Sequence, residues 1–271
     1  EGMDRQACSS VGTINRRTNA ATIGGNKPVK KEMRFVGFLQ DNLIPFFKKR
    51  ELSFIESYKE SDDVRTFVFE KPKDLTWKAG QYGLFTITHK SLKNGTRPFS
   101  VSSAPAENAV RITTRIGKEP SEFKKALLEL TPGMKITMRG PVGPFYLKEE
   151  TPTLFIAGGI GITPFRSMLK QIDATQKEYG KPIHLLYLDG NREYLFKDEL
   201  DAMVNRILTG LTYLGSRDEL HQEIDKFRSQ FNHGGKCFVA GPKSMVDQIV
   251  KDLLDKQVSK QQITKDAFFG Y

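Results

Sequence analysis

The pattern of apolar and polar positions changes once along this chain, close to residue 150. Before that point, short runs of β type are separated by turn signals such as Lys93-Asn94-Gly95 and Thr131-Pro132-Gly133. The expected strands are 52–58, 63–70, 82–88, 97–103, 109–116 and 134–139, with one helix near 121–130. Six short strands and a single helix predict a small antiparallel barrel.

After that point, apolar runs of strand length alternate with longer runs of helical period. The expected strands are 153–157, 183–188, 211–214 and 236–240, and the expected helices are 164–177, 195–207, 218–230 and 242–256. This alternation predicts a parallel sheet covered on both faces, with ligands outside the carboxyl ends of its strands. The predicted fold therefore has two domains, an antiparallel six-stranded β-barrel followed by an α/β parallel-sheet domain.

The first fifty residues differ from both regions. Residues 1–31 show no periodicity and are rich in Asn, Thr, Gly, Ser and basic residues, which predicts a loop or a disordered arm. Residues 33–47 place apolar side chains near helical spacing. We favour a helix packed on the body of the protein, and a helix lying on an anionic membrane surface is the alternative. The expected domains are a basic N-terminal arm over 1–50, the barrel over 51–150 and the α/β domain over 151–271.

The net charge of +10 is concentrated in that arm, which holds ten Lys/Arg against four Asp/Glu and therefore contributes +6. The rest of the chain is nearly balanced, so it does not resemble a nucleic-acid surface. The basic arm instead favours an acidic protein or a membrane-linked partner. No run of eighteen apolar residues and no secretory signal is visible. We expect a cytoplasmic protein, at the inner face of a membrane if a membrane segment precedes Glu1.

Cysteine and histidine are too sparse to form a metal centre. The chain has two cysteines and four scattered histidines without ligand spacing. This excludes a four-cysteine iron–sulfur cluster and a disulfide framework within the sequence. We therefore expect no metal and a reducing compartment.

The stretch Arg97-Pro98-Phe99-Ser100-Val101-Ser102-Ser103 combines an arginine suited to a phosphate, an aromatic ring and three hydroxyls. Strand alternation places Arg97 and Phe99 on one face and Ser100 on the other, unless the strand kinks at its end. Phe99 could lie flat on an aromatic ring system, and Ser100 could donate a hydrogen bond in the plane of that ring. Further along, Ser121 opens a helix whose free N–H groups can bind an anion.

A second motif, Gly158-Gly159-Ile160-Gly161-Ile162-Thr163-Pro164, follows an expected strand and opens a helix. Gly159 and Gly161 would let a phosphate approach the backbone, and the helix N-terminus supplies positive potential. The dinucleotide fingerprint Gly-x-Gly-x-x-Gly fails because Pro164 stands in place of its third glycine. Pro164 nevertheless fits a first helical turn, where no N–H is needed. Together the two motifs indicate two anionic cofactors held face to face.

Gly80-Gln81-Tyr82 precedes the first motif, and Gly140-Pro141-Val142-Gly143-Pro144-Phe145 follows it. In this order the segments resemble the ferredoxin–NADP reductase superfamily of flavin reductase modules and bacterial FAD/NAD(P)H oxidoreductases. That family has an Arg-x-(Tyr/Phe)-Ser-x-x-Ser flavin motif and a Gly-Gly-x-Gly-x-(Thr/Ser)-Pro nucleotide motif. The resemblance covers residues 51–271. It implies that the barrel is the flavin-binding domain and that the α/β parallel-sheet domain is the nucleotide-binding domain.

The resemblance assigns roles to individual residues. It implies that Arg97 binds flavin phosphate, that Phe99 stacks on the isoalloxazine and that Ser100 approaches flavin N5. It also implies that Ser121 lies at the pyrophosphate, which favours FAD over FMN, and that Thr163 lies near the nicotinamide. The further candidates for cofactor contacts are Thr113, Arg115, Asn191, Arg192, Gly241 and Pro242.

The resemblance also implies which coenzyme binds and which residues could cover the outer face of the flavin. Ser216 and Arg217 take the place of the Ser and Arg that hold the 2′-phosphate of NADP, so we expect NADPH rather than NADH. A terminal aromatic residue often covers the outer face of the flavin, and both Phe268 and Tyr271 are candidates. The family usually has a cysteine before Gly-Pro at the last helix, where this chain has Ala240.

The implied function is a flavin-dependent oxidoreductase that passes a hydride from NADPH to bound FAD and then electrons to an external acceptor. Ser100 and Thr163 are its catalytic candidates, and no dedicated general base is needed. The acceptor is a redox protein, a membrane redox domain, a quinone or a ferric chelate. The alternatives are a nicotinamide-only dehydrogenase, for which no proton-transfer residue stands out, and a non-enzymatic adaptor at a membrane surface or on nucleic acid.

Overall fold

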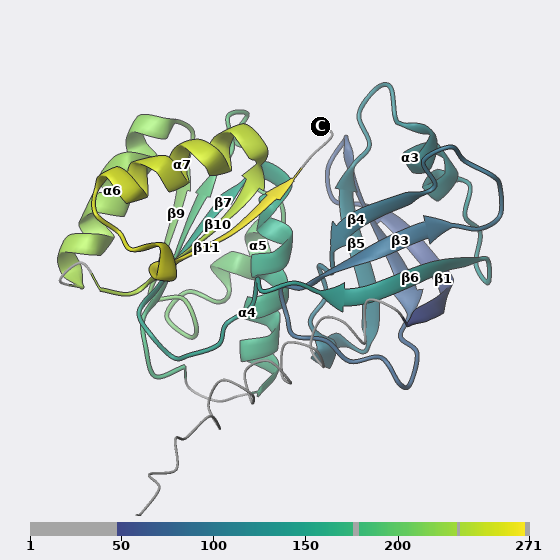
Figure 1. The fold of residues 1–271 in the computed structure, drawn as a ribbon, viewed down its shortest axis with the longest axis horizontal. Coiled ribbons are helices and arrows are strands. Elements are labelled where there is room, and N and C mark those ends of the chain that lie inside the picture. The colour runs from purple at the N-terminus through teal and green to yellow at the C-terminus, as the bar shows by residue number, and fades with distance from the viewer. Residues whose placement is uncertain (1–47, 176–178, 232–233, 269–271) are drawn as a thin grey trace, which may run out of the picture.

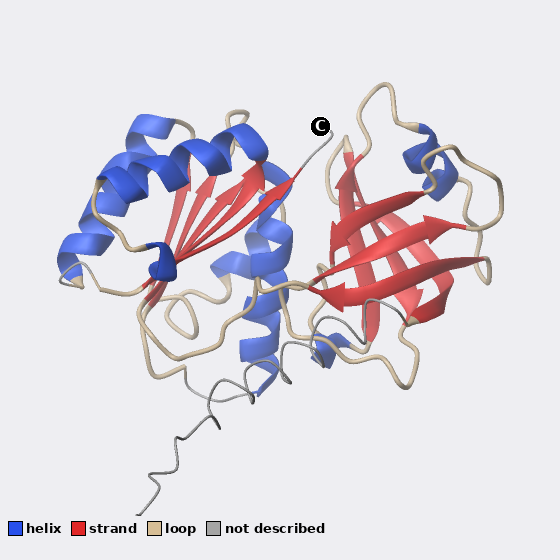
Figure 2. Cartoon of the chain, viewed as in Figure 1, coloured by secondary structure: helices blue, strands red, loops and turns tan. Residues whose placement is uncertain are grey.

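The computed structural model describes residues 48–175, 179–231 and 234–268. Its first half is a six-stranded antiparallel sheet formed by β1 (Lys49–Lys59), β2 (Val64–Glu70), β3 (Tyr82–Ile87), β4 (Thr96–Ser100), β5 (Ala109–Arg115) and β6 (Lys135–Val142). The strand order is β4-β3-β6-β1-β2-β5. The sheet curls, because the N–H of Ser102, just after β4, donates to the carbonyl of Arg111 in β5 at 2.9 Å. The predicted six-stranded antiparallel barrel is confirmed (Figure 2).

Phenylalanine dominates the interior of the barrel. The ring of Phe54 in β1 lies 5.6 Å from the ring of Phe69 and 6.5 Å from that of Phe67, both in β2. The helix α3 (Glu122–Leu128) adds Phe123 and Leu127 to the same cluster. Each such side chain contributes about 1.5–3 kcal/mol by leaving water, so these rings supply much of the stability of this half.

The second half is a five-stranded parallel sheet in the order β11-β10-β7-β8-β9. Its strands are β7 (Thr153–Gly158), β8 (Ile183–Leu188), β9 (Gly210–Leu214), β10 (Lys236–Pro242) and β11 (Ile263–Phe268). Helices α4 (Thr163–Thr175) and α5 (Lys197–Asp201) cover one face, and α6 (Arg217–Gln230) and α7 (Lys243–Asp255) cover the other (Figure 1). The predicted α/β domain is therefore confirmed.

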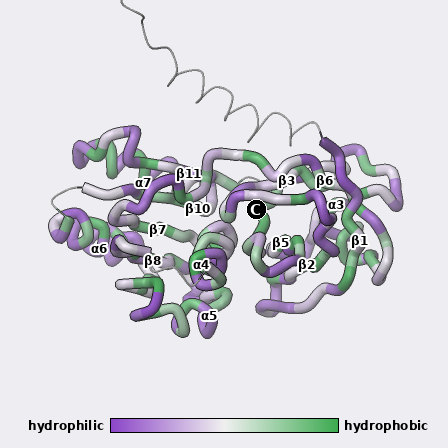
Figure 3. Tube along the Cα trace, turned by 90° about the horizontal axis from the view of Figure 1, so that it is seen from below, coloured by the Kyte–Doolittle hydropathy of each residue, from purple (hydrophilic) through white to green (hydrophobic). Residues whose placement is uncertain are grey.

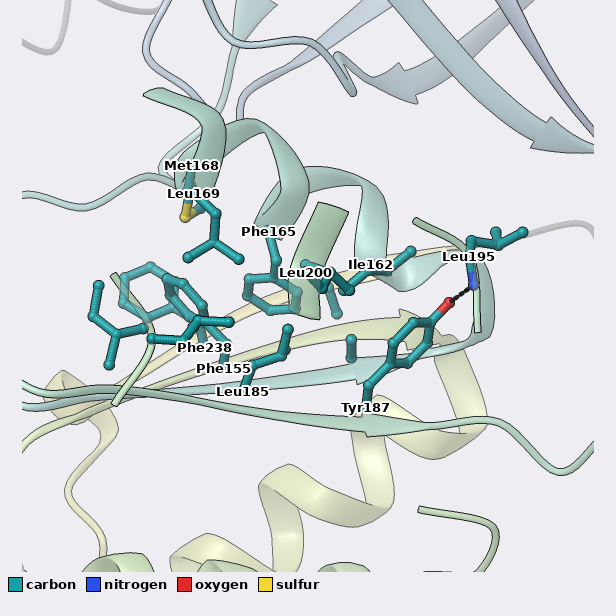
Figure 4. Packing of buried hydrophobic residues seen from close by; sticks show 14 of the residues in the cluster. Phe155, Ile162, Phe165, Met168, Leu169, Leu185, Tyr187, Leu195, Leu200 and Phe238 are labelled. Atoms are coloured by element: carbon teal, nitrogen blue, oxygen red, sulfur yellow. Dashed lines mark hydrogen bonds between the residues drawn. The ribbon is translucent and has the colours of Figure 1, made fainter. Parts of the chain in front are cut away.

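Apolar side chains of the central strands point alternately to the two faces of the sheet, so helices must cover both faces. Phe155 and Phe238 pack with Phe165 of α4, whereas Leu154 and Val239 pack with the helices of the opposite face. Figure 4 shows the first group, in which the rings of Phe155 and Phe165 are stacked at 4.7 Å. Figure 3 shows hydrophobic positions along the central strands and a mostly hydrophilic α6. A strand buried on both faces needs this nearly continuous apolar run.

Two elements differ from the sequence expectation. The helix expected over 195–207 is wrong in length, because α5 ends at Asp201 and Asn205 has a left-handed φ of 63° that no helix continues through. Strand β11 was not expected at all. It forms an edge of the sheet, pairs only with β10 and has the weak pattern Ile-Thr-Lys-Asp-Ala-Phe.

The start of the barrel also includes part of the basic run. β1 begins at Lys49, and Lys48 and Arg50 both contact the carboxylate of Asp74, at 2.5 and 3.3 Å. These cations therefore belong to the packed surface of the barrel. The loop expected over 1–31 and the helix expected over 33–47 lie outside the described residues.

The two halves meet at α4 (Figure 1). The ring of Phe145, which follows the barrel, lies 5.5 Å from that of Phe165. At Gly80, whose φ is +99°, an added Cβ would lie only 2.3 Å from Cε of Met168. The same Cβ would lie 2.4 Å from the carbonyl oxygen of Phe145, and glycine is the residue that adopts this φ readily. A side chain at position 80 would therefore strain the segment where the barrel meets α4.

Candidate functional site: two adjoining cavities

A first cavity of about 630 Å³ lies between the barrel and the end of β11. The predicted residues Arg97, Phe99, Ser100, Thr113, Ser121, Thr163 and Phe268 all line it. Aromatic rings, hydroxyls and cations are the groups that would stack a flavin ring, hydrogen bond to its edge and neutralise a pyrophosphate. The lining therefore fits a flavin dinucleotide.

Strand β4 contributes four consecutive residues to this wall, Arg97 to Ser100. Alternation alone would have turned Ser100 away from Arg97 and Phe99. Both faces can contribute because β4 is the edge of the sheet and ends at Ser100. The Arg97 guanidinium donates to the carbonyls of Asn94 and Thr96, at 3.0 and 2.9 Å, so the turn before β4 holds it at the cavity.

Two further aromatic rings support Phe99. Its ring lies 6.0 Å from that of Phe85 in an edge-on arrangement and 5.7 Å from that of Phe123. Phe123 lines the cavity itself, and neither Phe123 nor Tyr82, which also lines it, was among the predicted site residues. The first cavity therefore has a larger aromatic wall than the motif indicated.

The polar partner of Ser100 is a carboxyl group that the sequence did not indicate. Ser100 Oγ donates to Asp266 Oδ2 at 3.3 Å, and Asp266 lines the same cavity. Burial raises the pKa of Asp266 to about 6, although the bond from Ser100 works against the rise. This contact joins residues 166 positions apart. No local signal could have found it, because it depends on β11.

Thr113, which lines the first cavity, is the middle member of a short series of hydroxyls. Its Oγ1 lies 2.8 Å from Oγ1 of Thr66 and 3.0 Å from Oγ of Ser102. Thr66 in turn donates to the carboxylate of Glu60 at 2.5 Å. Three buried hydroxyls thus satisfy one another, and Thr113 is fixed in orientation.

Ser121 caps α3, since its Oγ accepts from the N–H of Lys124 at 3.5 Å. Lys124 also lines the first cavity, and burial together with the nearby Arg115 lowers its pKa. Sequence reasoning missed Lys124, although its place one helical turn after Ser121 was a usable signal.

A second cavity of about 440 Å³ opens at the carboxyl ends of the parallel strands. The predicted residues Gly159, Ser216, Arg217 and Pro242 line it. At Gly159, whose φ is +51°, an added Cβ would meet no atom nearer than Asp189 Oδ2 at 3.7 Å. The backbone there is open, as the approach of a phosphate requires.

The other two predicted glycines of the nucleotide site, Gly161 and Gly241, have a different role. An added Cβ on Gly161 would lie 2.2 Å from the carbonyl oxygen of Ala240, so this glycine lets the turn pack on β10. Gly241, with φ +152°, would meet the carbonyl of Gly158 at 3.0 Å. Neither lines a cavity, and neither does the buried Pro164. Cys237, in β10, is also buried, and burial raises the pKa of its thiol to about 11.

The cations around the second cavity are not equivalent. Arg217 begins α6, and in the described part of the chain its guanidinium has no hydrogen bond or ion pair. Arg192 packs on Gly215 and lies 3.9 Å from Glu219, and neither it nor Asn191 lines the cavity. Arg115, which comes from the barrel and forms an ion pair with Asp63, lines this second cavity and not the first.

Asp189, at the end of β8, is a site residue that the motifs did not reveal. It lines the second cavity, and its Oδ1 accepts from the N–H groups of Asn191 and Glu193, at 2.9 and 3.3 Å. A carboxylate in this position suits the hydroxyls of a ribose.

The two cavities adjoin at the second motif. Ile160 lines both, and Thr163, whose Oγ1 donates to the carbonyl of Ile160 at 3.1 Å, lines the first. Tyr271 lies outside the described residues, whereas Phe268 reaches the first cavity from the end of β11. A flavin-type cavity on a barrel and a nucleotide-type cavity on a parallel sheet define a two-domain oxidoreductase.

Comparison with known proteins supports this class. The oxidoreductase FAD-binding domain family matches residues 51–146, and the oxidoreductase NAD-binding domain family matches residues 155–251. The chain belongs to the ferredoxin–NADP reductase-like flavin oxidoreductases. This family membership disfavours the nicotinamide-only dehydrogenase and the adaptor.

Relatives are similar over most of the described region. Flavohemoprotein A of Dictyostelium discoideum is 27% identical over 248 residues, which cover 81% of this chain and 60% of the relative. The toluate 1,2-dioxygenase electron transfer component of Pseudomonas putida is 34% identical over 160 residues, covering 58% and 46%. A component of the Na(+)-translocating NADH-quinone reductase of Klebsiella pneumoniae is 25% identical over 227 residues, covering 74% and 56%. The chain spans about half the length of these curated relatives.

Solved structures share the fold. Ferredoxin-NADP+ reductase from Plasmodium falciparum has a TM-score of 0.70 at 20% identity, covering 81% of this chain and 96% of that one. A ferredoxin NADP+ reductase from Neisseria gonorrhoeae with bound FAD and NADP has a TM-score of 0.65 at 18% identity, covering 82% and 99%. In the described ranges, no helix combines the length and the apolar character needed to cross a bilayer.

Proposed function

We propose that this chain transfers a hydride from NADPH to FAD held in the first cavity and passes the electrons to an acceptor outside the chain. The observation that carries this proposal is the junction of the two cavities at Ile160. Hydride transfer requires the nicotinamide and the flavin to approach to about 3–3.5 Å, which two adjoining cavities allow. The proposed domains are the flavin-binding barrel over 51–150 and the NAD(P)-binding domain over 151–271.

Bound FAD supplies the redox chemistry, because it accepts a hydride and can release electrons one at a time. In this proposal Arg97 and Lys124 neutralise the pyrophosphate, and Ser121 hydrogen bonds to it. Phe99 supports one face of the ring, and Phe268 covers the other.

The two catalytic candidates, Ser100 and Thr163, are assigned to the edge of the flavin ring and to the nicotinamide, respectively. Ser100 would hydrogen bond at the ring edge, and the hydrogen bond from its Oγ to Asp266 Oδ2, at 3.3 Å, orients it. The carboxyl group of Asp266 holds a proton below pH about 6. Thr163 would orient the nicotinamide from the opposite wall of the first cavity.

The coenzyme is proposed to be NADPH because the second cavity has a cation available to bind the 2′-phosphate. Arg217 lines the second cavity, and its guanidinium has no partner among the described residues, next to the hydroxyl of Ser216. Arg115 is proposed to contact a phosphate of the same nucleotide from the barrel side. The names of the relatives point both ways, since one is a component of an NADH-quinone reductase and one solved structure holds NADP.

Anaerobic titration with NADPH and with NADH, followed through the visible absorbance of the flavin, tests the proposal. NADPH should bleach the flavin stoichiometrically and at lower concentration than NADH. A preparation that binds no FAD, or bound flavin that neither nucleotide bleaches, would contradict the function.

The coenzyme choice is tested with Arg217→Ala. A charge-assisted contact contributes about 1.5–3 kcal/mol, so KM for NADPH should rise roughly 10- to 100-fold while KM for NADH stays within about twofold. Arg192→Ala is the matched control and should change both values little. An equal rise for both coenzymes in Arg217→Ala would exclude a contact with the 2′-phosphate.

The acceptor is proposed to be an acidic redox protein or a membrane-associated redox partner at the cytoplasmic face, contacted through residues 1–50. The concentration of positive charge there supports this choice. The full chain should bind vesicles of anionic lipid, or an acidic ferredoxin, less strongly after Lys30→Glu with Lys31→Glu. Lys181→Glu with Lys251→Glu is the control of equal charge. An equal loss in both double variants would show that net charge alone is responsible.

A further inference from the structure

Two side chains of α4 cross from the nucleotide domain to the flavin strand. Arg166 donates from Nη1 to the carbonyl of Ser102 at 2.9 Å, and Ser167 donates from Oγ to the carbonyl of Ser103 at 2.7 Å. Both acceptors end the first motif, just after Ser100. Arg166 is 5% exposed and Ser167 is fully buried, so these bonds lie inside the domain interface.

Arg166 also joins carboxylates from the two domains. It contacts Glu107 of the barrel domain at 3.0 and 3.2 Å and Glu199 of α5 at 2.9 and 3.2 Å. The ring of Phe196 packs on the guanidinium at 5.0 Å. Arg111 of β5 contacts Glu107 as well, at 2.6 Å. A planar guanidinium can serve three acceptors in fixed directions, which a lysine cannot do.

The residues that make these contacts lie close in sequence to Thr163 and Ser100. Arg166 and Ser167 follow Thr163 by one helical turn, and Ser102 and Ser103 follow Ser100 by two and three residues. A helical turn is stiff, so the bonds relate the wall that carries Thr163 to the wall that carries Ser100. Both of those wall residues, Thr163 and Ser100, line the first cavity.

Two other hydrogen bonds cross between the domains, from Ser100 to Asp266 of β11 at 3.3 Å and from the N–H of Ala106 to Gln171 of α4 at 3.2 Å. Neither joins the start of α4 to the residues that end the first motif, as the bonds of Arg166 and Ser167 do.

Phe145 and Phe165, and Gly80 and Met168, form apolar contacts across the same boundary. Apolar contacts are not directional, so they allow small shifts that hydrogen bonds would resist. Loss of the hydrogen bonds of Arg166 and Ser167 should therefore misalign the two motifs without separating the domains.

We propose that Arg166 and Ser167 form an interdomain clamp that sets the position of the flavin strand against the nicotinamide turn. They are positioning residues, because neither lines a cavity. The inference rests on the proposed function for its kinetic consequence, but the clamp itself is testable without nicotinamide.

Arg166→Lys and Ser167→Ala test the clamp in the FAD-loaded full chain. A displacement near 1 Å costs about 100-fold in rate, so Arg166→Lys should slow hydride transfer at saturating NADPH roughly 100-fold, and Ser167→Ala roughly tenfold. KM for NADPH and the dissociation constant of FAD should stay within about twofold, because the lining residues are intact. Without nicotinamide, amide hydrogen exchange over 101–108 should be about tenfold faster in both variants.

Matched controls remove contacts of α4 that stay within the nucleotide domain. Arg206→Lys changes the ion pair with Asp173, and Thr175→Val removes a hydroxyl that donates to the carbonyl of Ile172. Both controls should leave the hydride-transfer rate and the exchange of 101–108 unchanged.

The outcomes separate the clamp from the proposed function. Hydride transfer within twofold of the unaltered protein in Ser167→Ala, with exchange equal to that of Thr175→Val, would overturn the clamp even if the variant melts at a lower temperature. If the unaltered protein shows no flavin reduction, the proposed function fails, and the exchange comparison alone decides the clamp. If Arg166→Lys does not fold, Ser167→Ala decides it in the same way.

Discussion

The two cavities of this protein are built on different principles. Side chains from β3, β4, β5, α3 and β11 form the first, so its wall gathers residues from Tyr82 to Phe268. Backbone and turns at the carboxyl ends of parallel strands dominate the second, around Gly159, Gly190 and Gly215. Cofactor binding in the first cavity should therefore be lost when a side chain is removed. Binding in the second cavity should be lost when a side chain is added at a glycine.

The largest effect is expected from Arg97→Ala. Losing the two or more charge-assisted bonds of a guanidinium to a pyrophosphate costs at least about 3 kcal/mol, so the dissociation constant of FAD should rise by roughly 100-fold or more. Flavin should then be lost during purification, as measured by visible absorbance per protein. Arg139→Ala, an exposed arginine of the same barrel that does not line the cavity, is the control. Full retention of FAD would remove Arg97 from the site.

The second cavity should be most sensitive to Gly161→Ala, although Gly161 does not line it. The added methyl group would lie 2.2 Å from the carbonyl oxygen of Ala240, and such overpacking costs about 1–3 kcal/mol. We expect a lower midpoint of thermal unfolding and weaker nucleotide binding. At Gly190, which does line the cavity, an added Cβ meets nothing within 4 Å, so Gly190→Ala should be nearly neutral. Equal unfolding midpoints for the two variants would contradict this packing.

Asp266→Asn probes the buried carboxyl group of the first cavity. The pKa of Asp266 is about 6 in the fold, above the value near 3.9 of an unfolded chain, so ionisation is disfavoured by folding. Folding stability contributed by the protonated form is complete below pH about 4 and is lost as pH rises through about 6. The Asn variant should therefore gain up to about 3 kcal/mol relative to the unaltered protein above pH about 6. Urea unfolding at several pH values measures this, and a difference independent of pH would refute the raised pKa.

The smallest effect is expected from Arg115→Ala, which tests whether a barrel residue belongs to the second cavity. Loss of one phosphate contact at a partly exposed arginine should weaken NADPH binding about tenfold, or about 1.4 kcal/mol, with FAD binding unchanged. Equilibrium titration of each cofactor separates the two. Loss of FAD without loss of NADPH would move Arg115 to the flavin.

Local sequence predicted the site residues correctly where a single segment forms that part of the site. The stretch Arg97 to Ser100 and the glycine turn at Gly159 reach the expected cavities, because strand, turn and helix start are local properties. Spacing could not decide which glycine meets a ligand. Gly159 and Gly161 are two positions apart, yet only the first faces a cavity while the second packs on β10.

The amino-acid order by itself determined the barrel, the parallel sheet and both cofactor motifs, since periodicity, turn residues and helix starts act over a few positions. Only the tertiary structure decided that Asp266 meets Ser100, that Arg115 joins the second cavity and that Arg166 links the domains. Each of these depends on chain segments far apart in sequence. A weakly patterned edge strand such as β11 takes its place only when a neighbouring strand pairs with it.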